Sequence, residues 1–429
     1  MGRAGNIVEK AIPTRPHVLT LTPFYPSYGD EVSGCFIAET LEQLKAEGVA
    51  SSVFAVDSIY HPRRRSSRQY PSEWIRYPQL PGNFGLAGAG AFLGASLLRR
   101  VRQLHARSPV SVIHAHAALP CGHAAAFLSR RLGIPFVVTI HGLDVFNRCF
   151  QNGIAASWRR RASLRVYRSA AQVICISEKI RQLLCDGAGT AVRAEVVYNG
   201  TDPGSFRPDG VHPDGVDSDC VNPDCIDPDC VNPDRTDPDR MNHGSDTRET
   251  AEILVVGNLL AGKGHELVLK AVARLNDLYP HLQCRMIGAG ADRDRFARLA
   301  GELGINDRVH FPGRQCRSDV AKAMRACTIF VLPSRYEGLG CVYLEAMASG
   351  KPAIACQGQG IDEIIRHGSN GWLIPVDGLE ELVQGLKVLL GDAQLRARIG
   401  RAARETILDR LTLAHQARKL LRIYQEVAG

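Results

Sequence analysis

Two carboxylates eight positions apart flank a glycine-rich turn in the second half of the chain. Glu337 lies in the turn and Glu345 in the segment that follows it. The apolar run 328–332 predicts a short buried strand that Pro333 ends, and a helix is expected to open near Leu339. The first turn of a helix directs free N–H groups and a positive dipole outward, which suits a diphosphate.

The two carboxylates are expected to do different work. A carboxylate on the helix, Glu345, can accept hydrogen bonds from the paired hydroxyls of a ribose, while Glu337 faces the cleft and can hold a sugar hydroxyl. The backbone of Gly338, Leu339 and Gly340 would then lie against the nucleotide. The alternative is that both carboxylates are solvated charges at an ordinary strand-to-helix turn.

From Glu337 onward the chain has the pattern E-G-x-G-x-x-x-x-E-A-M-A-x-G. It resembles the retaining glycosyltransferases of family 4, over nearly the whole chain apart from one insert. The resemblance implies α/β architecture of the GT-B type, with two Rossmann-like domains facing a cleft. It also implies transfer of a sugar from a nucleotide-diphosphate donor to a polysaccharide or lipid-linked acceptor in cell-surface or exopolysaccharide biosynthesis.

The resemblance assigns roles to further positions. His141 would hold the transferred sugar, although a lone histidine after a strand is more often structural. Lys263 would neutralise the donor diphosphate. At the family's arginine position the chain has Asn258, so part of that charge must be met elsewhere, with Arg314 as a candidate. Gly34 ends a loop of turn-forming residues that can close over a diphosphate or an acceptor.

Two further segments refine the resemblance. Gln359 replaces one glycine of the family's Gly-Gly-x-x-Glu segment, and this favours the branch of teichuronic acid and exopolysaccharide glycosyltransferases. His114 and His116 at i, i+2 share one face of a strand, but no third ligand is spaced for zinc. His116 is therefore a candidate acceptor-site residue.

No metal and no cofactor are expected. The Asp-x-Asp at 217–219 falls in a low-complexity repeat, and the diphosphate charge is expected to be met by Lys263, the helix start and backbone amides. Departure of the nucleoside diphosphate would leave an oxocarbenium-like sugar, and the leaving phosphate would take the acceptor proton on the same face.

Length and composition favour two soluble domains. The chain has 429 residues, 45% hydrophobic and 22% charged, and no apolar stretch approaches the ~20 residues that span a bilayer. The N-terminus lacks the apolar centre of a secretory signal, and most cysteines outside the repeat lie in apolar runs. These features predict a cytoplasmic protein with reduced thiols.

The predicted domains are 1–206 on the acceptor side, a linker at 207–250, a donor domain at 251–408 and a helix at 409–429 that crosses back. The linker contains a proline-rich five-residue repeat with Cys220, Cys225 and Cys230. With 11 Asp against 4 Arg over 207–248 its net charge is −7, which leaves +15 on the rest because the total is +8. This composition predicts a disordered acidic insert, with metal binding by its cysteines a minor alternative.

Strand-like runs alternate with helical stretches in the first domain, as in a parallel sheet. The runs are His17 to Thr22, Ser52 to Val56, Val112 to His116, Phe136 to Ile140, Val173 to Ile176 and Glu195 to Tyr198. The chargeless stretch from Asn83 to Leu98, with arginines on both sides, is either a core helix or a patch on the anionic inner face of the plasma membrane.

Three other classes of protein are weighed against a glycosyltransferase. A nucleotide-sugar epimerase can share the GT-B fold, and a non-catalytic sugar-nucleotide-binding protein would fit the departures at Asn258 and Gln359. A dinucleotide dehydrogenase is disfavoured because no Gly-x-Gly-x-x-Gly follows the first strand of either domain. No nucleic-acid partner is expected.

Overall fold

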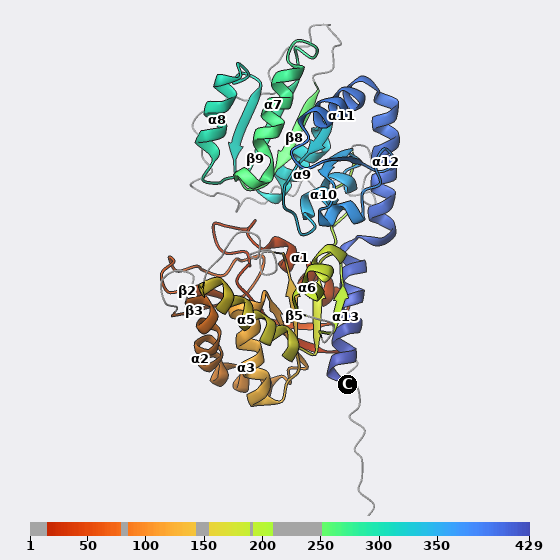
Figure 1. The fold of residues 1–429 in the computed structure, drawn as a ribbon. Helices are drawn as coiled ribbons and strands as arrows, with labels where there is room; N and C mark the ends of the chain where they lie inside the picture. The colour runs from red at the N-terminus through yellow and green to blue at the C-terminus, as the bar shows by residue number, and fades with distance from the viewer. Residues whose placement is uncertain (1–14, 79–84, 143–153, 189–191, 209–250) are drawn as a thin grey trace, which may run out of the picture.

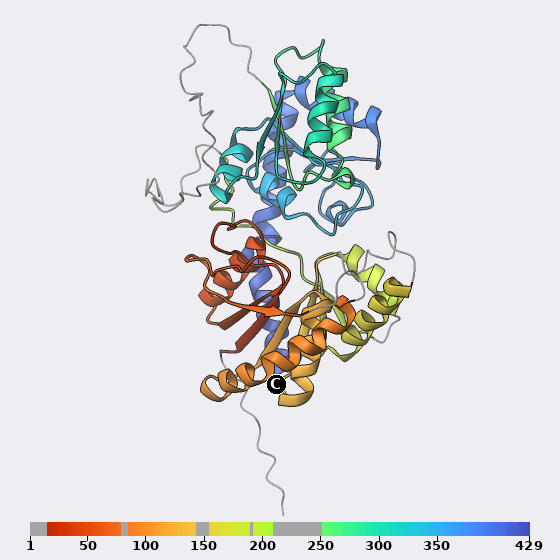
Figure 2. The same cartoon turned by 90° about the vertical axis from the view of Figure 1, so that its left-hand side faces the viewer.

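The computed structural model describes residues 15–78, 85–142, 154–188, 192–208 and 251–429. The predicted insert, with its repeat and its three closely spaced cysteines, lies outside the described residues. The described chain forms two parallel sheets, each with helices on its faces (Figures 1 and 2). The expected GT-B class, two Rossmann-like domains, is confirmed.

Within the described residues, the first sheet has seven parallel strands in the order β3-β2-β1-β4-β5-β6-β7. The order reverses between β1 and β4, and ligands of such sheets bind at the carboxyl ends of the strands beside this point. The strands are β1 (His17–Thr22), β2 (Ala50–Ser58), β3 (Glu73–Tyr77), β4 (Val112–His116), β5 (Phe136–Ile140), β6 (Gln172–Cys175) and β7 (Ala194–Val196).

The second sheet, counted over residues 251–429, has six parallel strands in the order β10-β9-β8-β11-β12-β13. Its order reverses between β8 and β11, whose following loops carry Lys263 and Glu337. The strands are β8 (Glu252–Val256), β9 (Gln283–Ile287), β10 (Val309–Gly313), β11 (Ile329–Val331), β12 (Ala353–Cys356) and β13 (Trp372–Ile374).

Helices connect the strands and cover both faces of each sheet (Figure 1). Those of the first domain are α1 (Cys35–Ala46), α2 (Gly85–Arg107), η1 (Ala118–Gly122), α3 (His123–Leu132), α5 (Ile154–Ser169) and α6 (Glu178–Ala188). Those that follow are η3 (Ala261–Lys263), α7 (His265–Leu275), α8 (Arg293–Glu302), α9 (Arg317–Ala326), α10 (Cys341–Ala348), η4 (Gly360–Glu363), α11 (Leu379–Gly391), α12 (Ala393–Arg410) and α13 (Leu413–Ala428).

The last two helices run along both domains, drawn in blue in Figure 1. α12 packs against α10 and α11, whereas α13 packs against α1 and β4. Ala417, Leu420 and Tyr424 of α13 are buried at helical spacing, as an amphipathic helix on a core requires. The crossing is tight, because a Cβ at Gly200 would lie 2.4 Å from the carbonyl oxygen of Thr412.

Several element predictions coincide with the structure and a few do not. The strands expected at 17–22, 112–116 and 136–140 are β1, β4 and β5. The sequence pattern does not predict β3 or β9, whose polar residues interrupt the apolar run, or the four-residue β12. The helix expected near Leu339 begins at Cys341, because Gly340 at φ +79° is left-handed and Leu339 is fully buried.

From Gly85 onward, the stretch predicted as either a core helix or a membrane patch belongs to α2, and its first two residues lie outside the described residues. Leu93, Leu97 and Val101 are fully buried in the core of the first domain, while Phe92 is 66% exposed. This burial supports the core-helix alternative, and the membrane contact stays a prediction. Among the helices of the described ranges, none is both long and apolar enough to cross a bilayer.

Candidate active site

The loops after β8 and β11 lie side by side where the second sheet reverses its order. The backbone N–H of Arg335 donates to the carbonyl of Gly262 at 3.0 Å. Gly264 has φ +78°, and a Cβ there would lie 2.1 Å from the carbonyl oxygen of Pro333. Only glycine therefore lets the first loop approach the second this closely.

This approach brings Lys263 against Glu337. The ammonium nitrogen lies 2.6 Å from the Oε2 atom, and the two side chains are 26% and 15% exposed. The pair neutralises two charges that are largely withdrawn from water. A phosphate group bound at Lys263 would replace this partner and leave Glu337 to accept a hydrogen bond from a hydroxyl.

The turn that carries Glu337 is held by the segment after β12. The backbone N–H of Glu337 donates to Oε1 of Gln359 at 3.0 Å, and its carbonyl accepts from the N–H of Gly360 at 3.1 Å. A Cβ at Gly360 would lie 1.7 Å from the carbonyl oxygen of Gly338. Gln359, which stands where the family resemblance expects glycine, thus supports the turn through its side chain.

The two domains touch at Gly338. A Cβ at this position would lie 3.1 Å from the carbonyl oxygen of His141 and 3.1 Å from Cδ1 of Ile176. His141 directly follows β5 in the first domain, while Gly338 adjoins Glu337 in the second. The structure therefore brings the segments of His141, Glu337 and Lys263 to one place between the domains.

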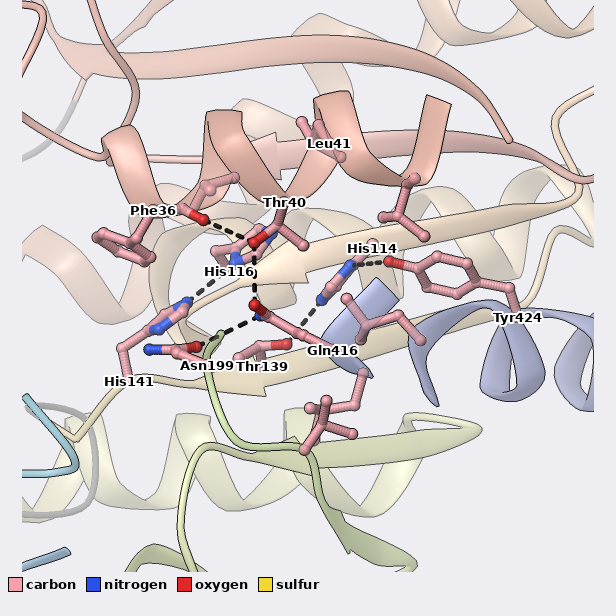
Figure 3. A pocket seen from close by; sticks show the side chains of 15 residues that line it. Phe36, Thr40, Leu41, His114, His116, Thr139, His141, Asn199, Gln416 and Tyr424 are labelled. Carbon is pink, nitrogen blue, oxygen red and sulfur yellow. Dashed lines mark hydrogen bonds between the residues drawn. The ribbon is translucent and has the colours of Figure 1, made fainter. Parts of the chain in front are cut away.

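His141 is the last member of a row of three histidines, of which His114 and His116 are buried and His141 is partly exposed (Figure 3). Its Nε2 lies 2.9 Å from Nδ1 of His116, whose ring stacks on that of His114 with centroids 4.3 Å apart. The ring nitrogens of His114 bond to the hydroxyls of Tyr424 and Thr139, each at 2.7 Å. His116, a predicted acceptor-site candidate, makes its hydrogen bond to His141.

Burial keeps these histidines neutral. Loss of hydration lowers the pKa of His141 to about 4 and that of His114 to about 3, with the charge of His141 a smaller cause for His114. The same burial holds the pKa of His116 well below its ordinary value. A neutral imidazole contributes hydrogen bonds rather than charge, so His141 can orient a hydroxyl without attracting phosphate.

Glu345 lies in α10 and is 3% exposed. Its Oε1 lies 2.5 Å from Nη1 of Arg317, and its buried Oε2 has no hydrogen-bond partner among the described residues. A buried carboxylate oxygen without a partner is costly, so a ligand hydroxyl that donates to it would be favoured.

The remaining predicted residues lie at the rims of the same region. Asn258 is exposed, and its carbonyl accepts from Nε2 of His265 at 2.9 Å. Gly34 precedes α1 with φ +76°, and a Cβ there would lie 2.4 Å from the carbonyl carbon of Phe24. Arg314, proposed to help neutralise the diphosphate, donates instead to Oδ1 of Asp30 in the first domain at 2.9 Å.

Within the described part of the chain, no group of three or more His, Cys, Asp or Glu side chains is arranged to hold a metal ion.

Both halves of the chain are similar to known proteins. Residues 35–205 match the family described as Glycosyltransferase Family 4, and residues 239–406 match that described as Glycosyl transferases group 1. Alpha-D-kanosaminyltransferase from Streptomyces kanamyceticus is 28% identical over 90% of this chain and 97% of its own. The lipopolysaccharide core biosynthesis glycosyltransferase LpsE of Rhizobium meliloti is 31% identical over 39% of this chain and 48% of its own.

Solved structures share the fold. Anabaena HepE in complex with UDP and glucose superimposes with a TM-score of 0.70 at 18% identity, covering 96% of this chain and 100% of HepE. A sucrose-phosphate synthase from Thermosynechococcus elongatus gives 0.69 at 20% identity, over 96% of this chain and 99% of its own. These structures show that the chain shares the GT-B fold. The two family models, which match residues 35–205 and 239–406, identify it as a glycosyltransferase of the family 4 type.

Sequence patterns miss three residues that the structure brings to the site. Arg317 reaches Glu345 across 28 positions of the chain, and no pattern singles it out. In the family's Gly-Gly-x-x-Glu segment, Gln359 stands out only because it replaces a glycine. Glu363 accepts from the backbone N–H groups of Glu178 and Lys179, at 2.8 and 2.6 Å, at the start of α6 in the other domain. A carboxylate at a helix N-terminus is favourable there.

The Lys263 loop should be sensitive to one methyl group. Gly264→Ala is expected to lower the free energy of unfolding by about 2 kcal/mol or more, because alanine is strained at positive φ and its Cβ would meet Pro333. Gly262→Ala, which has no atom within 4 Å of its Cβ, should change stability by less than about 0.5 kcal/mol. Equal urea midpoints for the two variants would contradict this account of the loop.

Stability should fall in mild acid because of the buried histidines. A group whose folded pKa is below its unfolded value stabilises the fold fully above the unfolded pKa of about 6.5 and loses that contribution toward the folded pKa. For His141, with a pKa of about 4, the loss at pH 5 is about 2 kcal/mol. Urea unfolding of His141→Gln should therefore change less between pH 7.5 and 5 than wild type.

The exposed His281 offers a matched control for this measurement. His281→Gln should keep the wild-type pH dependence of unfolding, because it removes the same kind of side chain from the surface. A His141→Gln variant with the same pH dependence as wild type would show that this histidine is not kept neutral by burial.

Proposed function

We propose that the chain is a retaining glycosyltransferase that moves a sugar from a nucleotide-diphosphate donor to a polysaccharide or lipid-linked acceptor in cell-surface or exopolysaccharide biosynthesis. We also propose that the chain belongs to the branch of teichuronic acid and exopolysaccharide glycosyltransferases. The observation that carries it is the meeting of His141 with the Gly338 turn, beside the Lys263–Glu337 pair. Groups for a sugar hydroxyl and for a diphosphate lie next to one another.

In the proposed donor complex, Lys263 binds the diphosphate together with the backbone N–H groups that precede α10. Glu337 and His141 bind hydroxyls of the sugar, and Glu345 binds the ribose. The buried, unpartnered Oε2 of Glu345 supports the last assignment. Anabaena HepE was solved in complex with UDP and glucose, so UDP is the first nucleotide to try.

The proposed reaction breaks the bond between the anomeric carbon and the phosphate oxygen. The acceptor hydroxyl attacks the resulting oxocarbenium-like carbon from the same face, and its proton passes to the leaving phosphate. Glu337 and Glu345 then bind and orient, unlike the acid and nucleophile of a glycosidase. The chain's contribution is position and charge, since no side chain forms a covalent bond in this scheme.

A donor screen tests the proposal. The protein is incubated with UDP-, GDP-, ADP- and dTDP-sugars and a saccharide or lipid-linked acceptor, and products are identified by mass spectrometry and NMR. Release of nucleoside diphosphate with an unchanged anomeric configuration in the product supports it. An epimerised nucleotide sugar would favour an epimerase, and binding of no sugar nucleotide would refute the proposal.

Glu345→Gln should weaken nucleotide binding. Loss of a charged hydrogen bond costs about 1.5–3 kcal/mol, which corresponds to a 10- to 150-fold rise in the Kd for UDP. Isothermal titration calorimetry measures the change. Glu380→Gln, which alters an exposed carboxylate that pairs with Arg274 in the same domain, serves as the control and should keep the wild-type Kd. An unchanged Kd in Glu345→Gln would remove the ribose assignment.

Turnover should not need a divalent metal, and it should need Lys263. Lys263→Ala is expected to lower turnover roughly 10²- to 10³-fold, as for a single lost electrostatic donor in a preorganised site. Wild type and variant are assayed side by side in excess EDTA and with added magnesium. Loss of wild-type activity in EDTA with recovery in magnesium would refute the metal-free scheme, and full activity of the variant would refute the role of Lys263.

A further inference from the structure

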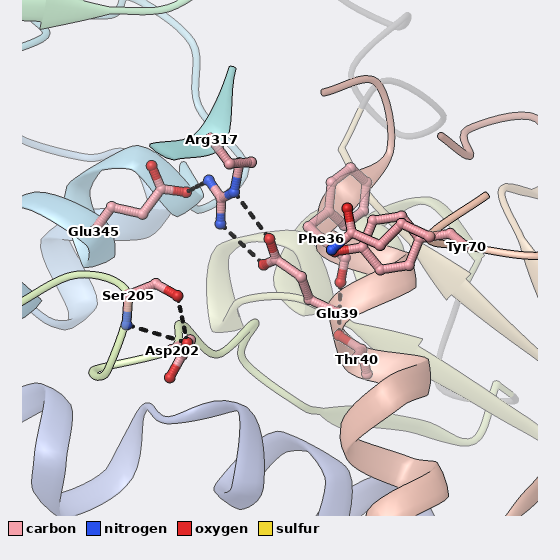
Figure 4. Close-up of polar contacts among 9 residues, drawn as sticks. Phe36, Glu39, Thr40, Tyr70, Asp202, Ser205, Arg317 and Glu345 are labelled. Carbon is pink, nitrogen blue, oxygen red and sulfur yellow. Dashed lines mark hydrogen bonds and ion pairs between the residues drawn. The ribbon is translucent and has the colours of Figure 1, made fainter. Parts of the chain in front are cut away.

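Arg317 lies between two carboxylates that belong to different domains (Figure 4). Its Nε and Nη2 each lie 2.9 Å from an oxygen of Glu39 in α1, which makes a two-bond fork. Its Nη1 lies 2.5 Å from Oε1 of Glu345 in α10. One guanidinium therefore joins the first domain to the residue proposed to bind ribose.

All three groups are largely withdrawn from water, with exposed side-chain fractions of 26% for Arg317, 18% for Glu39 and 3% for Glu345. Burial alone would lower the pKa of Arg317, but the charges of Glu345 and Glu39 raise it above its ordinary value. Burial raises the pKa of Glu39, and Arg317 opposes that rise. The cluster depends on a permanent positive charge at its centre.

The guanidinium is also held from a third direction. Its central carbon lies 4.8 Å from the centroid of the Phe206 ring, which is fully buried in the segment that leaves the first domain. In the same segment, Asp202 accepts hydrogen bonds from the backbone N–H groups of Gly204 and Ser205. The segment that carries Phe206 is therefore held by its own contacts, of which Figure 4 shows those between Asp202 and Ser205. Arg317 is thus fixed by both domains and by their connection.

The consequence falls on Glu345. Arg317 uses two of its nitrogens on Glu39 and offers one to Glu345, so it binds Oε1 and leaves the buried Oε2 without a partner. A guanidinium freed from Glu39 could instead bind both oxygens of Glu345 side by side. Contact between the domains therefore sets which atom of Glu345 stays open to a ligand.

We propose that Arg317 is a positioning residue for nucleotide binding: it holds Glu345 so that Oε2 meets a ribose hydroxyl, and its bond to Glu39 makes this arrangement depend on the closed domains. The inference rests on the proposed function, because it deepens the role given to Glu345. Arg317 acts through Glu345 and does not itself touch the nucleotide in this account.

The experiment compares UDP with 2′,3′-dideoxy-UDP by calorimetry on the full chain. Arg317→Met should raise the Kd for UDP 10- to 100-fold and leave the Kd for the dideoxy nucleotide within about twofold of wild type. Arg317→Lys should recover part of the loss, since it restores one positive charge without the fork. Glu39→Gln, which weakens the fork that holds Arg317 away from Oε2 of Glu345, should also raise the Kd for UDP more than the Kd for the dideoxy nucleotide.

The double variant Arg317→Met/Glu345→Gln removes the carboxylate that Arg317→Met alone leaves unpaired. It should bind UDP no more weakly than Glu345→Gln, because the two residues act as one unit. Additive losses, an equal loss for both nucleotides in Arg317→Met, or an unchanged Kd for UDP would overturn the inference.

Failure of the proposed function gives a different result. If wild type binds no UDP, the same comparison is made with GDP and 2′,3′-dideoxy-GDP and with the ADP pair. Binding of none of them, or a Glu345→Gln variant with wild-type affinity, removes the ribose site itself and the inference with it. Wild-type binding that is weakened by Glu345→Gln but not by Arg317→Met removes only the role of Arg317.

Discussion

The close backbone contact between Gly338 and the carbonyl of His141 is the constraint on which the candidate site depends. It lets the end of a strand in one domain lie against a turn in the other. Gly360 packs against the backbone of Gly338, and Gly264 allows the Lys263 loop to approach the backbone of Pro333 in a similar way. A side chain at any of these glycines would separate the segments that the site joins.

The electrostatics of the site fall into two kinds. Charged groups are paired, as Lys263 is with Glu337 and as Arg317 is with the carboxylates on either side of it. The histidines behind His141 are neutral, because burial costs an imidazolium its hydration. A ligand with both phosphate and hydroxyl groups would suit this site. Its phosphate would bind a charged side chain, and its hydroxyls would form hydrogen bonds with neutral groups.

Several polar contacts join the two domains. Glu363 receives the first N–H groups of α6, Arg314 binds Asp30, and Arg317 binds Glu39. The Arg317–Glu39 pair is largely withdrawn from water, so it is favourable only when its geometry is well defined. The segments that join the domains are thus the same ones that form the candidate site, and α13, which packs on the first domain, links the two domains a second time.

The sequence by itself determined the class of fold and the segments of the site. Strand and helix periodicity, the glycines around Glu337 and the spacing to Glu345 are local properties, so they are legible without the structure. Their partners are visible only in the three-dimensional structure: Arg317 binds Glu345, Gln359 binds the Glu337 turn, and Arg314 binds Asp30. The residues of each pair lie far apart in the chain and meet only when it folds. Local sequence patterns therefore do not reveal which residues will be in contact.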